Sequence, residues 1–312
     1  MKDANVWHQP VLYQSIIHGL APVSAGKYVD ATVGAGGHAE GILDKSSPDG
    51  QLLGLDLDPQ ALAIASQRLS RFSDRAHLVQ ASYITLAEQL RNLNWMAVDG
   101  IVLDLGVSSM QLDSPERGFS LRAEGPLDMR FNPMQEPSAA DLVNTLAVDD
   151  LADVIWRYGE ENKARRIAAA IADARPLETT TQLAAVVSKA VGRRSYGIHP
   201  ATRTFQALRI AVNAELENLL SFLPQAISAL TPGGRLAVIS FHSLEDRIVK
   251  QFIRRESRDC VCPPRQPECT CGHRASVVDI THRPITAGDD EVTQNPRARS
   301  ARLRIAEKRE LA

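Results

Sequence analysis

The feature that most constrains the fold is a glycine-rich turn between an apolar strand and a helix. The strand is expected at 28–33, and it runs into Gly34-Ala-Gly36-Gly37-His38. A second buried strand, expected at 51–57, ends on acidic residues. This order predicts a βαβ unit that binds a nucleotide-like ligand, because glycines let the backbone approach it and the helix amides face it. An acidic residue on the second strand can then accept the ribose hydroxyls.

The turn alone leaves the ligand open between two adenosine-containing cofactors, NAD and S-adenosylmethionine. Gly34-x-Gly36-x-x-Ala39 also matches the dinucleotide fingerprint, and Asp56 follows at about the 20-residue distance that this motif requires. Asp58 precedes Pro59 and is the expected cap of the next helix, which leaves Asp56 for the ribose. The rest of the chain has to separate the two cofactors.

Composition sets the outer bounds. The chain has 312 residues, of which 44% are hydrophobic and 23% charged, enough for two domains or one domain with an insertion. The sequence contains no apolar run of about 18 residues, which a membrane span would need. Residues 1–10 lack the apolar core of a signal peptide. We therefore expect a cytoplasmic protein with no membrane partner. The net charge of −2 means that any nucleic-acid surface is a local patch.

Hydrophobic patterning divides the chain into a sheet part and a helical part. Strands are expected at 28–33, 51–57, 77–81, 98–107 and 235–241. The first four alternate with helices, as a parallel sheet requires. Helices are expected at 151–158, 167–174 and 183–191, then one long helix from about 204 to 230 and a turn at 231–234. We therefore expect a sheet domain at 1–111, an inserted helical domain at 112–203 that binds the substrate, and the rest of the sheet domain at 204–312.

The end of the fourth strand favours S-adenosylmethionine over NAD. A dinucleotide domain continues as two mononucleotide halves, without a helical block after the fourth strand. Here that strand ends in Asp104, and the carboxyl ends of parallel strands form the ligand crevice, so Asp104 is expected beside Gly36 and Asp56. Class I methyltransferases that act on exocyclic amines place a short acidic or amide motif at this strand end, and Asp104 fits it.

Motifs along almost the whole chain resemble the bacterial small-subunit (16S) ribosomal RNA cytosine N4-methyltransferase family. A single one of these motifs can occur by chance, but all of them in this order are highly specific. They are Asp30–His38, Asp104–Asp113, Arg117–Phe119, Pro126–Arg130, Tyr158–Glu161, His199–Ala207, Val238–Arg247 and Asn295–Ser300.

The resemblance implies a class I, Rossmann-like and mostly parallel sheet with an inserted helical domain. It also implies S-adenosyl-L-methionine as methyl donor and a cytidine in the decoding region of 16S ribosomal RNA, within the small ribosomal subunit, as acceptor. No obligate protein partner is evident. Carried across, the resemblance implies that Gly36, Gly37 and His38 contact the cofactor, that Asp56 binds its ribose and that Tyr83 packs near the adenine. Asp104 and Gln111 would close the pocket around the methionine end.

The chemistry makes Asp104 the candidate catalytic residue, because the amine must be aligned with the methyl–sulfur bond and must lose a proton. The target base must be unstacked, and the helical insert is the expected clamp. His242, at the end of its strand, is a further candidate for the rim of the site. The candidate clamp residues are Arg130, Trp156, Tyr158, Arg165, Arg166, Arg193 and Arg194 in the insert, and Arg297, Arg299, Arg302 and Arg304 near the C-terminus.

All four cysteines fall in one short segment, as Cys260-Val-Cys262 and Cys269-Thr-Cys271. In a cytoplasmic chain this clustering favours metal binding over disulfides, but the usual zinc pairs have two or more residues between ligands. Structural zinc and plain reduced thiols in a proline-rich loop both remain open, and no metal is assigned to the site.

Two other functions stay open on the sequence. An NAD-dependent oxidoreductase shares the glycine turn, and a non-catalytic ribosome assembly factor can keep the pocket as a relic. Intact Gly36, Asp56 and Asp104 argue against such decay.

Overall fold

The computed structural model of the chain describes residues 10–192, 199–264 and 266–310, and these residues form two compact units. One unit comprises Met1–Gly106 and Glu217–Ala312, and the other comprises Val107–Leu216. Helix α10 (Thr202–Asn213) belongs to the second unit, where it packs against α7 (Val148–Gly159), whereas the sequence analysis let the sheet domain resume at 204.

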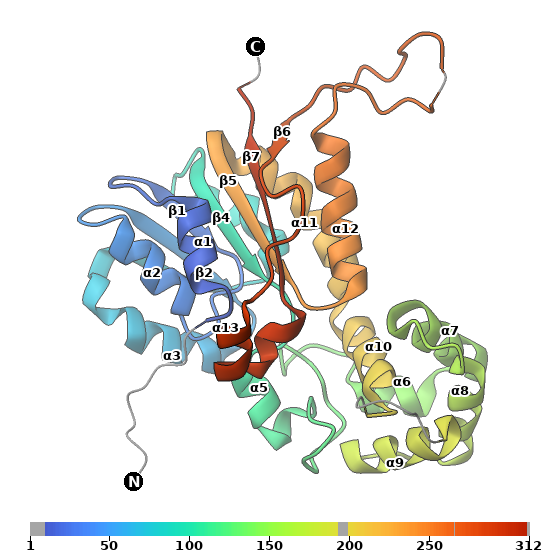
Figure 1. Cartoon of the computed structure of the whole chain (residues 1–312). Coiled ribbons are helices and arrows are strands. Elements are labelled where there is room, and N and C mark those ends of the chain that lie inside the picture. Colours follow the sequence, from blue (N-terminus) through green and yellow to red (C-terminus); the bar gives the residue numbers. More distant parts are fainter. Residues whose placement is uncertain (1–9, 193–198, 265, 311–312) are drawn as a thin grey trace. The chain divides into compact units, whose positions relative to one another are not determined.

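The first unit is built on a seven-stranded, mostly parallel sheet (Figure 1). Its order is β3-β2-β1-β4-β5-β7-β6, in which β1 to β5 are parallel and β7 is antiparallel to both of its neighbours. This confirms the expected class I fold. The strands are β1 (Lys27–Asp30), β2 (Gln51–Asp56), β3 (Ala76–Gln80), β4 (Val98–Asp104), β5 (Leu230–Ser240), β6 (Val277–Asp279) and β7 (Arg302–Lys308).

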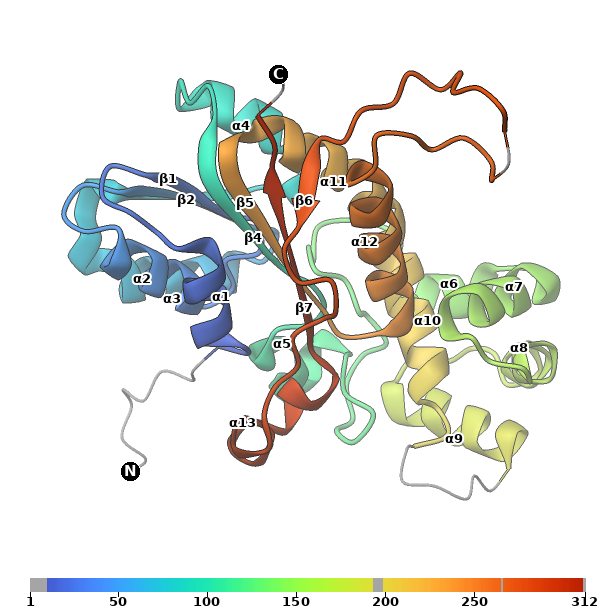
Figure 2. The same cartoon turned by 45° about the horizontal axis from the view of Figure 1, so that its top comes forward.

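Helices cover both faces of this sheet (Figures 1 and 2). Alternate residues of each strand point to opposite faces, so Tyr28 and Val29 on β1 belong to two different apolar clusters. One cluster packs the sheet against α1 (Tyr13–Leu20), α2 (Gly37–Lys45) and α3 (Pro59–Leu69). The other packs it against α4 (Leu86–Asn92), α11 (Glu215–Ala229) and α12 (Ser243–Glu256). The remaining elements of this unit are α13 (Asp289–Gln294) and the short 3-10 helices Ser70–Arg75, Tyr83–Thr85 and Pro296–Ser300.

The strand order positions the site. The chain moves outward from β1 to β2 and β3, then returns to place β4 on the other side of β1. The carboxyl ends of β1 and β4 therefore lie next to each other at a topological switch point, which is where open α/β sheets bind ligands.

Two local predictions had different outcomes. Asp58 caps α3, because its Oδ1 accepts a hydrogen bond of 3.0 Å from the amide of Gln60, as the Asp-Pro pair predicts. The single helix expected from 204 to 230 is wrong. Ala214 has a φ of 47°, in the left-handed region, and this residue divides the segment into α10 and α11.

The second unit is helical around its own apolar core, which Ile155, Ile167, Leu183 and Phe205 help to form. The helical block expected between the sheet strands is therefore present. The helix expected from the spacing of 151–158 is α7, and those expected at 167–174 and 183–191 are α8 and α9. Besides α7 and α10, the elements are α5 (Ser109–Asp113), the 3-10 turn Pro115–Arg117, α6 (Ala139–Thr145), α8 (Ala164–Asp173) and α9 (Thr180–Val191). Within the described residues, every helix is too short or too polar to cross a membrane.

Candidate active site

The glycine turn joins β1 to α2 in a conformation that side chains disfavour. Gly34 and Gly36 have φ values of 51° and 80°, in the left-handed region where glycine carries no steric penalty. A Cβ at Gly36 would lie in contact with Ala65, 3.4 Å from its Cα, so the left-handed φ is what favours glycine here. Gly36 is the N-cap of α2, so the unbonded amides of the first helical turn follow it directly. This is a suitable cradle for a polar ligand.

Asp56 ends β2 and is held by the turn. Its Oδ2 accepts a hydrogen bond of 2.9 Å from the amide of Gly34, and its Oδ1 accepts one of 2.9 Å from the amide of Asp58. Burial raises the pKa of Asp56, although these two amides and that of Leu57 oppose the shift. The carboxylate is thus fixed in orientation, with further lone pairs for hydroxyl donors.

Asp104 is the last residue of β4, next to β1, and its backbone is hydrogen-bonded to the loop that follows β1. Its amide donates a hydrogen bond of 2.7 Å to Oγ1 of Thr32. Its Oδ2 lies 3.6 Å from Nε2 of His38, too far for a hydrogen bond but close enough for attraction if the ring is protonated. Oδ1 of Asp104 is buried and has no hydrogen-bond partner among the described residues. Asp104 therefore presents an unused acceptor at the switch point.

Asp30 is a third carboxylate of this site, and the sequence analysis did not select it. It ends β1 and is 1% exposed, and its Oδ2 has no hydrogen-bond partner among the described residues. Burial raises the pKa of Asp30 to about 7, against the lowering effect of His38, while Asp104 and Asp56 raise it further. The position of Asp30 in the sequence could have indicated this role, because an acidic residue that ends a buried strand before a glycine turn faces the ligand crevice.

Three residues with unpartnered buried polar atoms lie close together at the ends of β1 and β4 and the start of α2. They are Asp30, Asp104 and His38, whose two ring nitrogens also lack partners among the described residues. Buried polar atoms are normally hydrogen-bonded, so such a group indicates a missing polar ligand or water. S-adenosylmethionine carries a sulfonium and an ammonium group, and an acidic set of this kind suits a cationic ligand. The residues therefore fit the expected cofactor.

Tyr83 and Gln111 are the remaining candidates of the cofactor site. Tyr83 begins a 3-10 turn after β3, and its ring stands edge-on to Phe222 of α11, with 5.1 Å between the centroids. Its contact with an adenine stays a prediction. Gln111 belongs to the second unit, where its Oε1 accepts a hydrogen bond of 3.1 Å from the amide of Ser108 in a capping box. Its place at the methionine end also stays a prediction.

His242 caps α12 instead of projecting freely from the end of β5. Its Nδ1 accepts a hydrogen bond of 3.4 Å from the amide of Glu245, which lies in the first turn of α12. Asp246, in the same turn, pairs with Arg304 of β7, where Nε of Arg304 lies 2.7 Å from Oδ1 of Asp246.

Two arginines proposed as RNA contacts are occupied by structural contacts. Arg304 is 5% exposed and forms a buried ion pair, so its assignment to the RNA surface is wrong. The guanidinium of Arg130 forms two hydrogen bonds to Asp128 and one to the carbonyl of Gln135. The pattern of basic residues gave no signal of either contact, although Asp128 is only two residues from Arg130, whereas Asp246 is 58 residues from Arg304.

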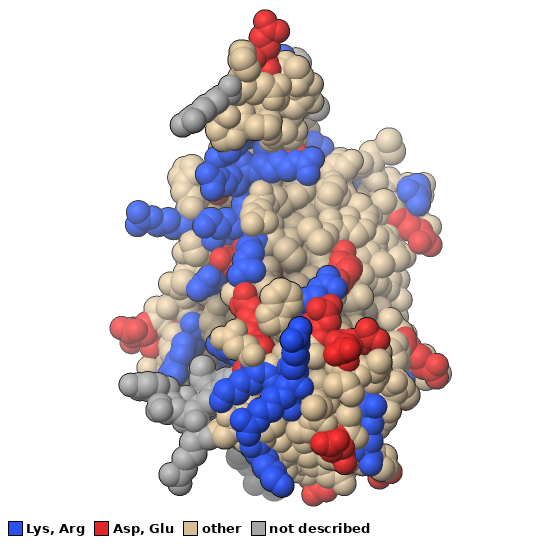
Figure 3. Space-filling model, turned by 90° about the vertical axis from the view of Figure 1, so that its right-hand side faces the viewer, with Lys and Arg blue, Asp and Glu red and all other residues tan. Residues whose placement is uncertain are grey.

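The other candidate contacts are more open. Trp156 is 59% exposed, Arg165, Arg166 and Arg299 are exposed, and Tyr158 and Arg297 are half-buried. Arg302 is also exposed, but its Nη1 lies 3.1 Å from Oδ2 of Asp246, so it too makes a structural contact. Arg193 and Arg194 lie outside the described residues. The first unit adds an exposed basic stripe on the face where Figure 3 shows Lys and Arg side chains gathered. It consists of Arg247, Lys250 and Arg254 on α12, and of Arg258 just after that helix.

Comparison with known proteins identifies the family. Residues 5–309 match the model of the MraW methylase family. The chain is 54% identical over 301 residues to the ribosomal RNA small subunit methyltransferase H of Dehalococcoides mccartyi, covering 96% of this chain and 86% of that protein. The protein of the same name from Thermomicrobium roseum is 51% identical over 304 residues, with 96% and 93% covered.

Among solved structures, a methyltransferase of Streptococcus mutans in complex with SAH matches with a TM-score of 0.46 and 10% identity, over 97% of this chain and 99% of that chain. A match over 305 of the 312 residues is nearly the whole protein, and two relatives share half of its residues. The chain belongs to the MraW methylase family.

Proposed function

We propose that this methylase transfers the methyl group of S-adenosyl-L-methionine to the N4 exocyclic amine of a cytidine in the decoding region of 16S ribosomal RNA. The observation that carries the proposal is the unused buried acceptor of Asp104, at the end of β4 and facing His38 beside the glycine turn. Relatives that share half of its residues are named small-subunit ribosomal RNA methyltransferases, which supports this substrate class.

The chemistry requires alignment and removal of one proton. A cytosine amine donates its lone pair into the ring, so it is a poor nucleophile. The donor supplies a strongly electrophilic sulfonium methyl group when it is bound. Asp104 accepts a hydrogen bond from the amine through its carboxylate, which orients the nitrogen, and it then takes the proton that leaves, directly or through one water molecule.

The other residues hold the donor and exclude water. The first-turn amides of α2 after Gly36 face the ligand, and Asp56 accepts the ribose hydroxyls with the lone pairs that Gly34 and Asp58 leave free. Tyr83 offers an aromatic surface for the adenine. Asp30 and His38 carry the unpartnered polar atoms that complete the site for the methionine end.

The RNA partner enters as an unstacked base held by the helical unit. Enzymes that act on bases in RNA hold the flipped base against aromatic or apolar side chains, and Trp156 is an exposed ring that suits this role. Exposed arginines such as Arg165 and Arg166 suit contacts with the phosphates. The reaction belongs to the cytoplasm, with the small ribosomal subunit as the proposed form of the substrate.

Two measurements test this proposal. Isothermal titration calorimetry distinguishes the two candidate cofactors, because S-adenosylmethionine should bind to the protein and NAD should not. Small subunits from cells that lack the gene should then accept labelled methyl groups from the purified protein, and protein-free 16S RNA should accept fewer. Binding of NAD in preference to S-adenosylmethionine would favour an oxidoreductase. Binding of S-adenosylmethionine without any methyl transfer to either RNA would favour an assembly factor.

A further inference from the structure

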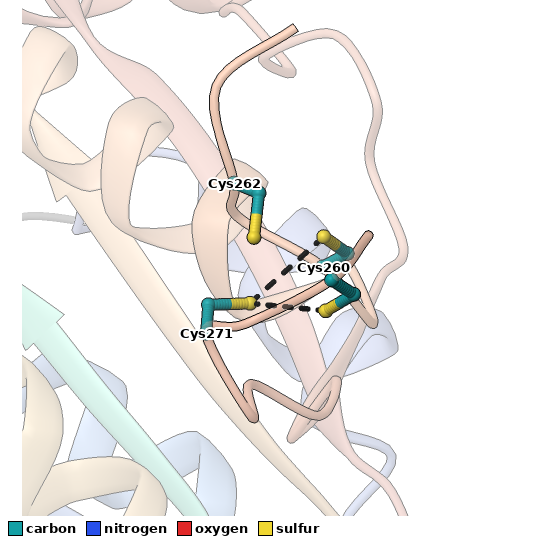
Figure 4. A group of neighbouring side chains, drawn as sticks. Cys260, Cys262 and Cys271 are labelled. Atoms are coloured by element: carbon teal, nitrogen blue, oxygen red, sulfur yellow. Dashed lines mark hydrogen bonds between the residues drawn. The ribbon is translucent and has the colours of Figure 1, made fainter. Parts of the chain in front are cut away.

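The loop between α12 and β6 brings all four cysteines of the chain together, although the chemistry above does not use it (Figure 4). The Sγ atoms of Cys269 and Cys271 are 3.6 Å apart, and those of Cys271 and Cys260 are 3.9 Å apart. Together with Cys262, the four sulfur atoms lie within 4.8 Å of one another. The two Cys-x-Cys pairs thus face each other across the loop.

These distances match one tetrahedral metal ion. Zinc–thiolate bonds of about 2.3 Å place the four sulfur atoms of a tetrahedral site roughly 3.8 Å apart. The observed 3.6 and 3.9 Å lie on either side of that value. A disulfide needs a separation of about 2.05 Å, and all four cysteines are free thiols. The short spacing within each pair counted against zinc in the sequence, but the fold supplies the convergence that spacing cannot show.

The loop has little else to hold its tip. Its base is closed by the amide of Ser276, which donates a hydrogen bond of 2.8 Å to the carbonyl of Glu256. Beyond that base, the residues from Arg258 to Gly272 that the structure describes are exposed, except for a half-buried Cys262. Free cysteines are among the most buried residue types, so three exposed thiols beside a fourth need another explanation. A shared metal ion explains it, because the ion replaces an apolar core in a small loop.

We propose that Cys260, Cys262, Cys269 and Cys271 bind one Zn²⁺ ion in a closed tetrathiolate site that fixes the tip of this loop. All four positions are filled by protein ligands, which is the arrangement of a structural rather than a catalytic zinc site. The amide of Val261 points at Sγ of Cys271, 3.5 Å away, and such outer contacts orient thiolate ligands. His273 lies outside this group of four sulfur atoms, and its Nε2 lies 3.1 Å from the carbonyl oxygen of Arg255.

The position of the site supports a structural role. Helix α12 starts beside the carboxyl end of β5 and runs for 14 residues, about 21 Å, toward the amino ends of the parallel strands. The loop follows that far end, and Figures 1 and 2 show it projecting beyond the sheet. The glycine turn and Asp104 lie at the carboxyl ends of the parallel strands, far from this loop. The ion therefore does not participate in methyl transfer.

Elemental analysis of the untagged full-length protein, purified under reducing conditions, tests the proposal first. One zinc per chain is the expected result, and Co²⁺ in its place should give the strong visible absorption of a tetrahedral thiolate site. Iron in place of zinc, a disulfide between any two of the cysteines, or protein without metal whose four thiols react freely would each overturn it.

Variants then locate the ion. The double variant Cys269→Ser/Cys271→Ser should lose the zinc, whereas His273→Gln should keep one equivalent. The affinity for S-adenosylmethionine and the midpoint of thermal unfolding show whether each variant is folded, independently of the metal. Zinc that stays in the folded double variant, or that leaves with His273→Gln, would contradict the ligand set. Loss of zinc should also speed trypsin cleavage after the already exposed Arg258 and Arg274, because the loop backbone is then no longer fixed, while the rest of the sheet unit stays resistant.

Discussion

His38 and Asp104 approach each other across the gap between the start of α2 and the end of β4, with Nε2 of His38 3.6 Å from Oδ2 of Asp104. The distance is too long for a hydrogen bond, and both ring nitrogens of His38 lack partners among the described residues. Asp30 adds a third buried group with an unused oxygen. Unsatisfied buried polar atoms destabilise the folded protein, and a polar ligand that forms hydrogen bonds with them removes this cost.

Replacing Asp104 tests its role in chemistry. Asp104→Asn keeps the shape and the amide contact with Thr32 but removes the proton acceptor, so kcat at saturating donor should fall about 10²- to 10⁴-fold while the fold changes little. The affinity for the donor should also fall, because one charge of the acidic set is lost. Asp74→Asn, at an exposed position, serves as the matched control. Single-turnover methyl transfer and donor titration check the two parts separately. Normal turnover in Asp104→Asn would show that another group takes the proton.

Asp30 should make the stability of the protein depend on pH. Because burial raises the pKa of Asp30 to about 7, the folded protein keeps a proton between pH values of about 4 and 7 that the unfolded chain releases. The free energy of unfolding therefore falls as the pH rises through this window. Asp30→Asn removes this dependence, so its stability relative to the parent should rise by up to about 4 kcal/mol from pH 4 to pH 8. Urea unfolding at several pH values measures it, and parallel profiles of the two proteins would refute it.

The buried pair between Asp246 and Arg304 should hold β7 to α12. Burial works to raise the pKa of Asp246, but Arg304 and Arg302 outweigh it and lower that pKa. The stabilisation is therefore present at neutral pH and is lost as the pH falls through the lowered pKa. Arg304→Met leaves Asp246 without its main partner and should cost about 3 kcal/mol. Arg299→Met, at an exposed position, should cost less than about 0.5 kcal/mol. Thermal unfolding compares them, and equal midpoints would contradict a buried pair.

Binding of the ribosomal substrate should weaken steeply as salt rises, because phosphate contacts release counterions. The double variant Arg165→Ala/Arg166→Ala should lower the slope of log affinity against log salt by about 0.7 to 0.9 for each phosphate that it no longer neutralises. Arg91→Ala removes an exposed arginine of α4 outside the proposed set and should leave the slope unchanged. Filter binding over a salt series gives the slopes, and a slope that both variants share with the parent would remove α8 from the interface.

Local patterns predicted much of the sheet unit. Each of the first five strands has a hydrophobic run bounded by turn residues, and the Asp-Pro pair correctly marked the start of α3. Strands β6 and β7 were not predicted. β6 has only three residues, and β7 carries Arg304 at a buried position, which makes the strand resemble a basic surface segment. Its buried charge is satisfied by Asp246, a partner 58 residues away that local patterning cannot reveal.

The candidate site shows the same limit. Gly36, His38, Asp56 and Asp104 were selected from motifs, and the structure gathers them at the carboxyl ends of β1, β2 and β4. Asp30 belongs to the same motif but was not selected, because its burial depends on how α2 and the neighbouring strands cover it. The zinc site needed the loop geometry for the same reason. Convergence in space decides these roles, and spacing along the chain indicates it only in part.

The most direct test of the account identifies the methylated atom. Small ribosomal subunits from cells that lack the gene are incubated with the purified protein and S-adenosylmethionine that carries a deuterated methyl group. The RNA is then digested, and the labelled nucleoside is compared by mass spectrometry with N4-, N3- and C5-methylcytidine standards. The account predicts label in N4-methylcytidine, with or without a 2′-O-methyl group, and far less label with Asp104→Asn. Label in any other nucleoside, or no label from protein that binds the donor, would contradict it.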